Sequence, residues 1–136
     1  MTRSLLIVDD NESVRESLRF LLERRGYITV VAASGAEALA LAAQQAFDGA
    51  IVDINMPGMN GIAVCRTLYA RAAESGHKLA IWMMTGARTR EVAKASAEAG
   101  ALGIFCKPFD LEELFRSFDE QFGPPPSPPE AGPSAV

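Results

Sequence analysis

Acidic side chains stand at the ends of two short apolar runs in this sequence. Asp9 and Asp10 directly follow the run 5–8, and Asp53 lies near the end of the run 50–54. Three carboxylates brought together would repel one another and raise their pKa values unless a positive charge lay among them. Mg²⁺ would supply that charge, because it prefers oxygen ligands, keeps several waters, and is commonly bound by one or two carboxylates together with a phosphate.

A hydroxyl and an ammonium follow two further apolar runs. Thr85 comes after the run 79–84, and Lys107 with Pro108 comes after the run 104–106. Lys107 is suited to contact a phosphoryl oxygen as a point charge, and the Thr85 hydroxyl can donate a hydrogen bond to another. These residues together predict a site for phosphate chemistry assisted by a divalent cation.

Each of these residues taken alone has an ordinary structural interpretation. Paired acids such as Asp9 and Asp10 often begin a helix, because carboxylates favour its positive end. Asp53 alone would be a loop acid, Thr85 a turn residue and Lys107 a solvated cation. Their combination at the ends of four apolar runs favours the chemical interpretation.

The apolar runs indicate the elements that must position these groups. Five runs recur, at 5–8, 28–32, 50–54, 79–84 and 104–106. Continuous apolar runs are typical of parallel strands that helices cover on both faces. Five such strands alternating with helices predict an α/β fold with a doubly wound parallel sheet. Ligands bind at the carboxyl ends of the strands in such sheets, where all the candidate residues fall.

Five helices are expected between and after these strands. The first ends before Gly26, the second covers 36–45 behind a capping pair, the third ends near Gly76 and the fourth covers 91–99. The third should bury one apolar stripe, formed by Ile62, Cys65, Leu68, Tyr69 and Ala72. The fifth should follow the cap residue Asp110 and bury a stripe formed by Leu111, Leu114, Phe115, Phe118 and Phe122.

Composition limits the class of protein. A chain of 136 residues suits one domain, and we place it at 1–122, followed by a Pro-rich tail or linker at 123–136 that is expected to be disordered. The net charge of −4 argues against direct nucleic-acid binding. Cys65 and Cys106 are expected to be reduced and packed, which suits the cytoplasm. No signal peptide or membrane span is expected.

Four motifs resemble the receiver domains of response regulators, such as the chemotaxis receivers of two-component signalling. They are VDDNESVRESL, VDINMPGMNG, MMTG and CKPF, and the resemblance covers residues 4–122. It implies a flavodoxin-like sheet in the order 2-1-3-4-5, with Asp53 as phosphoacceptor. It further implies that Mg²⁺ is held by Asp53, Asp10, the backbone carbonyl of Asn55 and, through a water, Asp9.

The same resemblance implies the remaining roles. Thr85 and Lys107 would contact the phosphoryl group, and the Lys107–Pro108 peptide would be cis. The phosphodonor would be a phosphohistidine on a sensor histidine kinase or phosphotransfer protein, and the chain would catalyse only its own phosphoryl transfer and dephosphorylation. Phosphorylation would shift the conformation to control an effector domain or target protein, and the oligomeric state, including a homodimer, stays open.

One position departs from the family pattern. The residue three before the lysine is usually aromatic, but here it is Ile104. Phe105 comes one place later, and alternation along a strand would send its ring to the opposite face. The usual aromatic readout of activation is therefore not expected.

Two rival functions are weighed against signalling. A phosphatase of the haloacid dehalogenase type also uses an Asp nucleophile with Mg²⁺, but it needs an acid two residues later, where this chain has Asn55. A module of the same fold regulated by binding alone is the second rival, and Ile104 favours it slightly. His77, expected in an exposed loop, is assigned no role.

Overall fold

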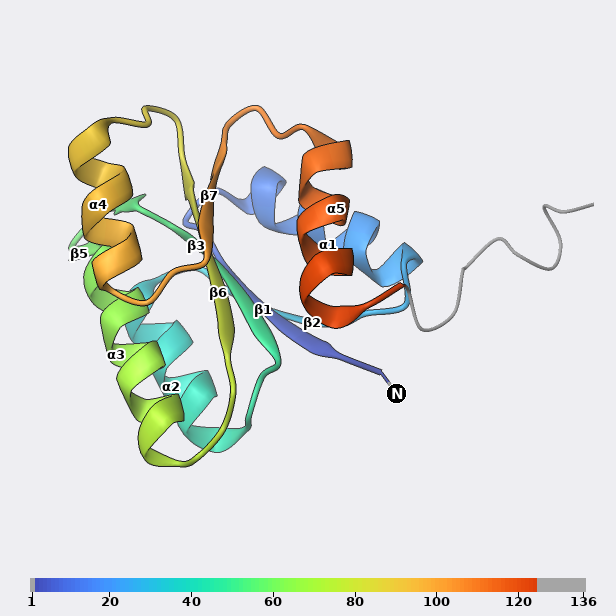
Figure 1. The fold of residues 1–136 in the computed structure, drawn as a ribbon, viewed down its shortest axis with the longest axis horizontal. Helices are drawn as coiled ribbons and strands as arrows, with labels where there is room; N and C mark the ends of the chain where they lie inside the picture. The colour runs from blue at the N-terminus through green and yellow to red at the C-terminus, as the bar shows by residue number, and fades with distance from the viewer. Residues whose placement is uncertain (1, 125–136) are drawn as a thin grey trace, which may run out of the picture.

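Five parallel strands form the centre of the computed structural model, which describes residues 2–124. Figure 1 shows them in the order β2-β1-β3-β6-β7, which is the predicted order 2-1-3-4-5 counted over the strands of this sheet. Strand order reverses between β1 and β3, the place where sheets of this kind bind ligands. The strands are β1 Ser4–Val8, β2 Ile28–Ala32, β3 Gly49–Asp53, β6 Ala80–Thr85 and β7 Gly103–Cys106.

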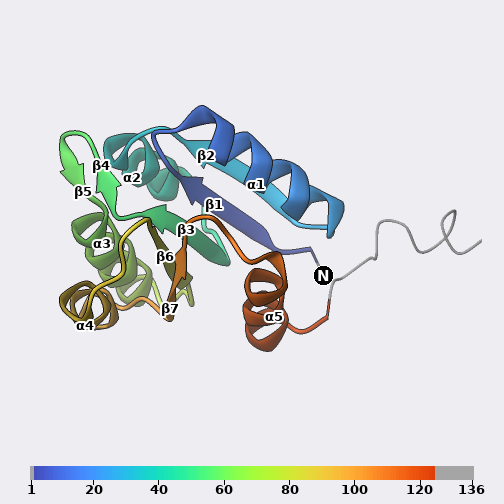
Figure 2. The ribbon, with the colours of Figure 1, turned by 90° about the horizontal axis from the view of Figure 1, so that it is seen from above.

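Five helices cover both faces of the sheet, as predicted. Figures 1 and 2 show α1 and α5 on one face, and α2, α3 and α4 on the other. The helices are α1 Glu12–Arg24, α2 Gly35–Gln44, α3 Gly61–Glu74, α4 Arg90–Glu98 and α5 Leu111–Phe122. None of those described within residues 2–124 combines the length and apolar character needed to cross a bilayer.

A side chain caps the N-terminus of each of the five helices, and the sequence predicted two of these caps. Ser34 accepts a hydrogen bond from the Glu37 N–H at 3.1 Å, and Asp110 accepts from the Glu112 and Glu113 N–H groups. Such caps satisfy backbone donors that the first helical turn leaves without partners. Asn11, Asn60 and Thr89 cap the other three helices, and the sequence analysis did not identify them.

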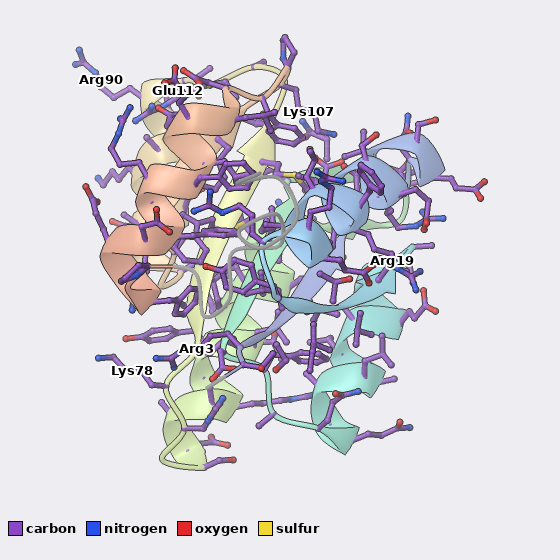
Figure 3. All side chains as sticks on the ribbon, turned by 90° about the vertical axis from the view of Figure 1, so that its right-hand side faces the viewer. Arg3, Arg19, Lys78, Arg90, Lys107 and Glu112 are labelled. Carbon is purple, nitrogen blue, oxygen red and sulfur yellow. The ribbon has the colours of Figure 1, made fainter. Side chains whose placement is uncertain are left out.

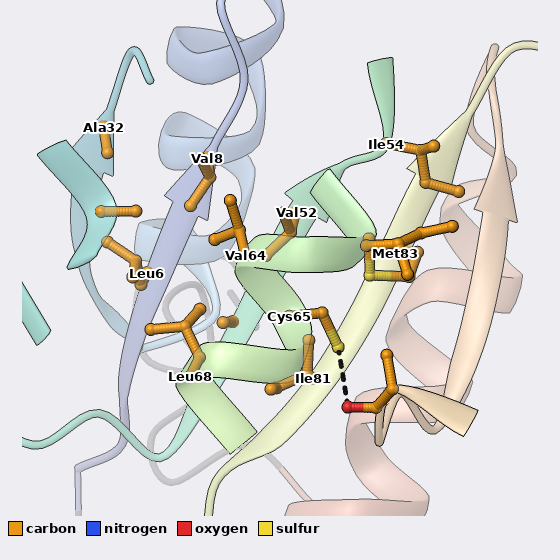
Figure 4. Close-up of a cluster of buried hydrophobic side chains, with 14 of the residues drawn as sticks. Leu6, Val8, Ala32, Val52, Ile54, Val64, Cys65, Leu68, Ile81 and Met83 are labelled. Atoms are coloured by element: carbon orange, nitrogen blue, oxygen red, sulfur yellow. Dashed lines mark hydrogen bonds between the residues drawn. The ribbon is translucent and has the colours of Figure 1, made fainter. Parts of the chain in front are cut away.

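The two faces of the sheet carry separate apolar clusters. Figure 4 shows the first, in which Val52 of β3 lies with Val64 and Cys65 of α3. The neighbouring Ile51 belongs to the second cluster, under α1 and α5. Alternate residues of one central strand thus enter opposite cores, which explains why its sequence is a continuous apolar run. In the second cluster Trp82 lies 4.7 Å from Phe118, ring centre to ring centre.

A short hairpin after β3 was not anticipated. Its strands β4 (Asn55–Met56) and β5 (Met59–Asn60) pair antiparallel, and Gly58 turns between them at φ +78°. Strands of two residues are too short to produce a periodic pattern, so the sequence indicated only a loop. Two sheet strands are also displaced by one residue from their predicted runs, in opposite directions, so that β3 ends at Asp53 and β6 ends at Thr85.

Three local predictions are wrong. Tyr69 and Leu111 were placed on buried stripes, but they are 49% and 40% exposed. Tyr69 instead lies against Gly100, where an added Cβ would come within 2.5 Å of its ring. Cys106 was expected to be packed and is exposed, because it ends an edge strand.

His77 lies in a loop, as predicted, but it is not fully exposed. Its side chain is half-buried, and its Nε2 lies 2.5 Å from the carbonyl oxygen of Phe47. It borders a hollow of about 570 Å³ between the ends of α2 and α3. The prediction of disorder over 123–136 falls, from residue 125 onward, outside the described residues.

Candidate functional site

The carboxyl ends of four neighbouring strands bring the predicted residues to one edge of the sheet. Asp9 follows β1, Asp53 ends β3, Thr85 ends β6 and Lys107 follows β7. The strand registers align these ends, since Asp53 pairs with Met84 and Thr85 with Cys106. In Figure 3 Lys107 lies at this end of the sheet, whereas Arg3 and Lys78 lie at the opposite end.

Three carboxylates converge at this edge. Asp9, Asp10 and Asp53 each offer an oxygen within 4.8 Å of the other two. Asp9 and Asp53 are 0% and 4% exposed, and Asp10 is exposed. The site therefore has two carboxylates under the surface and one at its mouth, an oxygen donor set that suits a hard divalent cation.

Lys107 joins the two buried acids. Its Nζ donates to Asp9 Oδ2 at 2.9 Å and to Asp53 Oδ2 at 3.4 Å. Burial acts to lower the pKa of Lys107, but the hydrogen bond that its ammonium donates to Asp9 and the charges of both acids outweigh this effect and raise the pKa above its usual value. Lys107 is therefore a fixed cation at neutral pH. The Lys107–Pro108 peptide is cis, which confirms that prediction.

Asp53 carries an electrostatic cost in this arrangement. Burial raises its pKa, and the charge of Asp9 raises it further. The charge of Lys107 and the Asn55 N–H, which donates to Asp53 Oδ1 at 3.3 Å, act in the opposite direction without cancelling the rise. A bound cation would relieve the repulsion between carboxylates, so the residues present fit a metal.

Asn55 lies at the rim of the site, where β4 begins. Its side chain is exposed, and with Asp10 it borders an open hollow of about 600 Å³. Of the three carboxylates of the site, only that of Asp10 lines this hollow. The sequence predicted a role for the backbone carbonyl of Asn55, and that role stays a prediction.

Thr85 is placed at the site but is engaged with its own loop. Its hydroxyl accepts from the Ala87 N–H at 3.1 Å and donates to the Ala87 carbonyl at 3.3 Å. Within residues 2–124 its hydroxyl makes no hydrogen bond to the carboxylates. A contact between Thr85 and a phosphoryl group would require this local pair to open.

The side chains of Ile104 and Phe105 point to opposite faces of the sheet, as predicted. Ile104 packs toward the cluster under α2, α3 and α4, whereas Phe105 enters the opposite cluster and stacks on Trp82 at 6.3 Å. Phe105 is 4% exposed. Its ring therefore cannot take the place of the usual aromatic residue without leaving a packed core.

One residue near the site was missed by the sequence analysis. Arg15 of α1 donates from a guanidinium nitrogen to the backbone carbonyl of Asp9 at 2.8 Å. Arginine is common on the solvent-facing side of helices, and nothing in the sequence pattern singled out Arg15. Only the course of α1 over the end of β1 reveals it.

Comparison with known proteins agrees with this geometry. The response regulator receiver domain family matches residues 5–119. The response regulator MprA of Mycobacterium sp. (strain KMS) is 40% identical over 110 residues, which are 81% of this chain and 46% of that protein. The chain thus spans just under half the length of the curated relatives it matches.

Solved structures give the same result. Chemotaxis protein CheY4 of Vibrio cholerae superposes with a TM-score of 0.81 and 31% identity, covering 89% of this chain and 99% of that one. A response regulator of Burkholderia pseudomallei, solved with a phosphorylated aspartic acid, a calcium ion and citrate, superposes with a TM-score of 0.76 and 28% identity, covering 83% and 64%. With its family match, sheet order and acidic edge, this chain belongs to the receiver domains of two-component response regulators.

Proposed function

We propose that this chain is a phosphoacceptor switch in which Asp53 accepts a phosphoryl group with the help of Mg²⁺. The observation that carries the proposal is the contact set around Asp53. Two further carboxylates offer oxygens within 4.8 Å, and the Lys107 ammonium lies 3.4 Å from Asp53 Oδ2. A nucleophile, a cation-binding pair and a fixed positive charge are the groups that phosphoryl transfer requires.

Asp53 would act as the nucleophile. One carboxylate oxygen attacks the phosphorus of a phosphohistidine, an O–P bond forms, the P–N bond breaks, and the freed imidazole nitrogen takes up a proton. Asp53 becomes an acyl phosphate, and no oxidant or second substrate is needed. The Asn55 N–H, already bonded to Asp53 Oδ1, helps to hold the carboxylate in orientation.

The cation would be held mainly by the acids. Asp10 and Asp53, with the Asn55 backbone carbonyl, are the proposed direct ligands, and Asp9 would act through a water. A bound Mg²⁺ neutralises charge on the transferring oxygens. Asp9 is suited to an indirect role because its two oxygens already accept from the Asn11 N–H and from Lys107.

The switch would begin with Lys107 and Thr85. A new phosphoryl dianion competes for the Lys107 ammonium and attracts the Thr85 hydroxyl away from Ala87. Opening the Thr85–Ala87 pair would move the loop that leads to α4, and so shift a population between two packings. Because Ile104 stands where the family usually has an aromatic residue, this readout would run through the loop, α4 and β7 without the usual aromatic ring.

The relatives support a signalling context. We propose a histidine kinase or phosphotransfer protein as the donor, and a cytoplasmic location. Residues 1–122 would form the receiver domain, with 123–136 as a linker. Because the curated relatives are about twice as long as the matched region, an effector domain is proposed for the whole protein. Receiver domains are generally regulatory and not enzymes.

Two rival functions remain testable. Turnover of phosphate esters is disfavoured because Asn55 stands where a phosphatase of the haloacid dehalogenase type has its second acid. A steady-state assay of phosphate release should find no turnover. Regulation by binding alone would leave signalling in the host unchanged by Asp53→Asn.

Acetyl phosphate with Mg²⁺ tests the proposal directly. We expect intact mass spectrometry to find one added phosphoryl group on the wild type and none on Asp53→Asn. Asp48→Asn is the matched control, because Asp48 pairs with Arg3 and the Ser4 N–H at the opposite end of the sheet. This variant should still be labelled. An unlabelled wild type, or a labelled Asp53→Asn, would contradict the proposal.

A further inference from the structure

Asp10 is the least supported of the three carboxylates. Within residues 2–124 its carboxylate has no hydrogen-bond or ion-pair partner, whereas Asp9 and Asp53 both contact Lys107. Its position must therefore be set by its backbone. A proposed metal ligand whose side chain is unsupported depends on a rigid attachment to bind the ion well.

The preceding peptide unit is held from one side by Arg15. The guanidinium of Arg15 donates to the backbone carbonyl oxygen of Asp9 at 2.8 Å. That oxygen belongs to the peptide that joins Asp9 to Asp10. Because the peptide is planar, fixing its oxygen also fixes the direction of the Asp10 N–H and Cα.

The other polar groups of Asp9 are all occupied by other segments. Its N–H donates to the Ala32 carbonyl at 3.1 Å, Oδ1 accepts from the Asn11 N–H at 2.9 Å, and Oδ2 accepts from Lys107. None of these three contacts reaches the peptide shared with Asp10, whereas the hydrogen bond from Arg15 does.

We propose that Arg15 is a positioning residue for the cation site, which clamps the Asp9–Asp10 peptide and thereby aims the Asp10 carboxylate. This inference rests on the proposed function, since the ion to be held is the Mg²⁺ of phosphoryl transfer. In this role Arg15 would act through Asp10 and would need no contact with the ion or the phosphoryl group.

The direction in which Mg²⁺ affinity changes when Arg15 is replaced distinguishes a positioning role from a purely electrostatic one. Removing a positive charge near a cation site should tighten Mg²⁺ binding if charge alone matters. Removing a clamp should weaken it, and loss of groups that orient metal ligands typically costs about 10–100-fold in affinity. Arg15→Gln distinguishes the two, because it removes both the charge and the guanidinium.

The test is a titration of the full chain with MgCl₂, followed by amide chemical shifts in NMR spectra. We expect Arg15→Gln to weaken Mg²⁺ binding about tenfold. Arg15→Lys, a milder variant, should change affinity in the same direction by less. Arg19→Gln is the matched control. Arg19 lies one turn further along α1 and, among residues 2–124, forms ion pairs only with Glu16 and Glu23, so the Mg²⁺ affinity should stay within about twofold of wild type.

A second readout concerns rate. With acetyl phosphate, the half-saturating Mg²⁺ concentration should rise in Arg15→Gln, while the rate at saturating Mg²⁺ stays within about threefold of wild type. Unchanged or tighter binding in either Arg15 variant, or an equal loss in Arg19→Gln, would overturn the clamp. If the wild type binds Mg²⁺ with the expected Arg15 dependence but is never phosphorylated, the proposed function fails and the clamp stands. If the wild type does not bind Mg²⁺, both fail.

Discussion

At the scale of single residues, the site is a balance of charge under partial burial. Asp53 has a raised pKa because burial and the nearby Asp9 charge disfavour its ionised form. Lys107 relieves part of that cost and is itself held by Asp9 at 2.9 Å. A cluster that is costly when empty of cations is well suited to bind one, because binding removes the repulsion.

The stability of the metal-free protein should report this cost. A carboxyl whose pKa is higher in the folded state binds protons more readily when folded, so its contribution is fully present below the unfolded pKa and is lost as pH rises through the folded pKa. We therefore expect Asp53→Asn, in EDTA at pH 7, to melt a few degrees above the wild type. The difference in melting temperature should disappear at pH values below about 4, where Asp53 is protonated in both the folded and the unfolded state.

Added Mg²⁺ should reduce or reverse this difference in melting temperature, because only the wild type keeps the full ligand set and gains stability from binding. Thermal unfolding followed by circular dichroism, in EDTA and in MgCl₂, measures the melting temperatures under both conditions. A variant that melts below the wild type at neutral pH in EDTA would show that Lys107 outweighs burial and the Asp9 charge.

Replacing Lys107 should separate stability from metal binding. Lys107→Ala leaves the fully buried Asp9 without its partner at Oδ2, so we expect a loss of about 2 kcal/mol in the metal-free free energy of unfolding. Mg²⁺ affinity should be unchanged or tighter, because the lost charge repels cations and, in the proposed function, would face the phosphoryl group. The response to phosphorylation should weaken more than metal binding.

Urea denaturation and the MgCl₂ titration measure these two quantities. Lys78→Ala is the control, since Lys78 is exposed at the opposite end of the sheet. Equal losses of metal binding and of the phosphorylation response in Lys107→Ala would contradict the role given to Lys107.

At the scale of elements, the position of Asp53 depends on how closely α3 approaches the end of β3. Gly61 begins α3, and its N–H donates to the Ile54 carbonyl at 2.8 Å. A Cβ at this position would lie 2.0 Å from the Asp53 carbonyl oxygen. The hairpin between β3 and α3 returns the chain onto the backbone of the proposed nucleophile, and only glycine permits that contact.

Gly61→Ala should therefore disturb both fold and site. We expect it to lower the free energy of unfolding by about 2 kcal/mol or more, because the clash is with backbone that cannot rotate away, and to weaken Mg²⁺ binding. Gly86→Ala is the matched control beside Thr85: a Cβ there meets nothing within 4 Å, and its effect should stay within about 0.5 kcal/mol. Equal effects of the two substitutions in urea denaturation would contradict the close approach.

At the scale of the whole molecule, the sheet separates two cores that meet only across its strands. Cys65 is fully buried in the core under α3, where burial raises the pKa of its thiol to about 11. Cys106 is exposed at the end of the edge strand β7. The two thiols therefore report on different events: Cys106 on the native surface and Cys65 on the opening of the core.

Thiol labelling should show this difference. With a disulfide reagent at pH 8, we expect one thiol per chain to react at once and the second only upon unfolding, because the Cys65 thiol is both shielded and protonated. Cys106→Ser should abolish the fast reaction. Fast modification of both thiols in the native protein would mean that the core under α3 opens far more readily than its packing implies.

Much of this protein is determined by local sequence. The continuous apolar runs predict buried parallel strands, Ser34 and Asp110 predict two helix starts, and the polar residues after the runs predict the site edge. These inferences succeed because strand burial and helix capping are short-range properties. The one-residue displacement of β3 and the two-residue strands β4 and β5 escape such patterns, since pairing partners set those bounds.

Other features are decided only by tertiary structure. Whether Tyr69, Cys106 and His77 are exposed depends on what packs beside them, which no local pattern contains. The spacing of 98 residues between Lys107 and Asp9 carries no information on the 2.9 Å between their side chains. The contact of Arg15 with the Asp9 carbonyl joins residues only six apart, but it depends on the course that α1 takes after β1. Sequence determined which chemical groups reach the edge of the sheet. Packing decided which of them touch, because contacts such as that of Lys107 with Asp9 join segments that are distant in sequence.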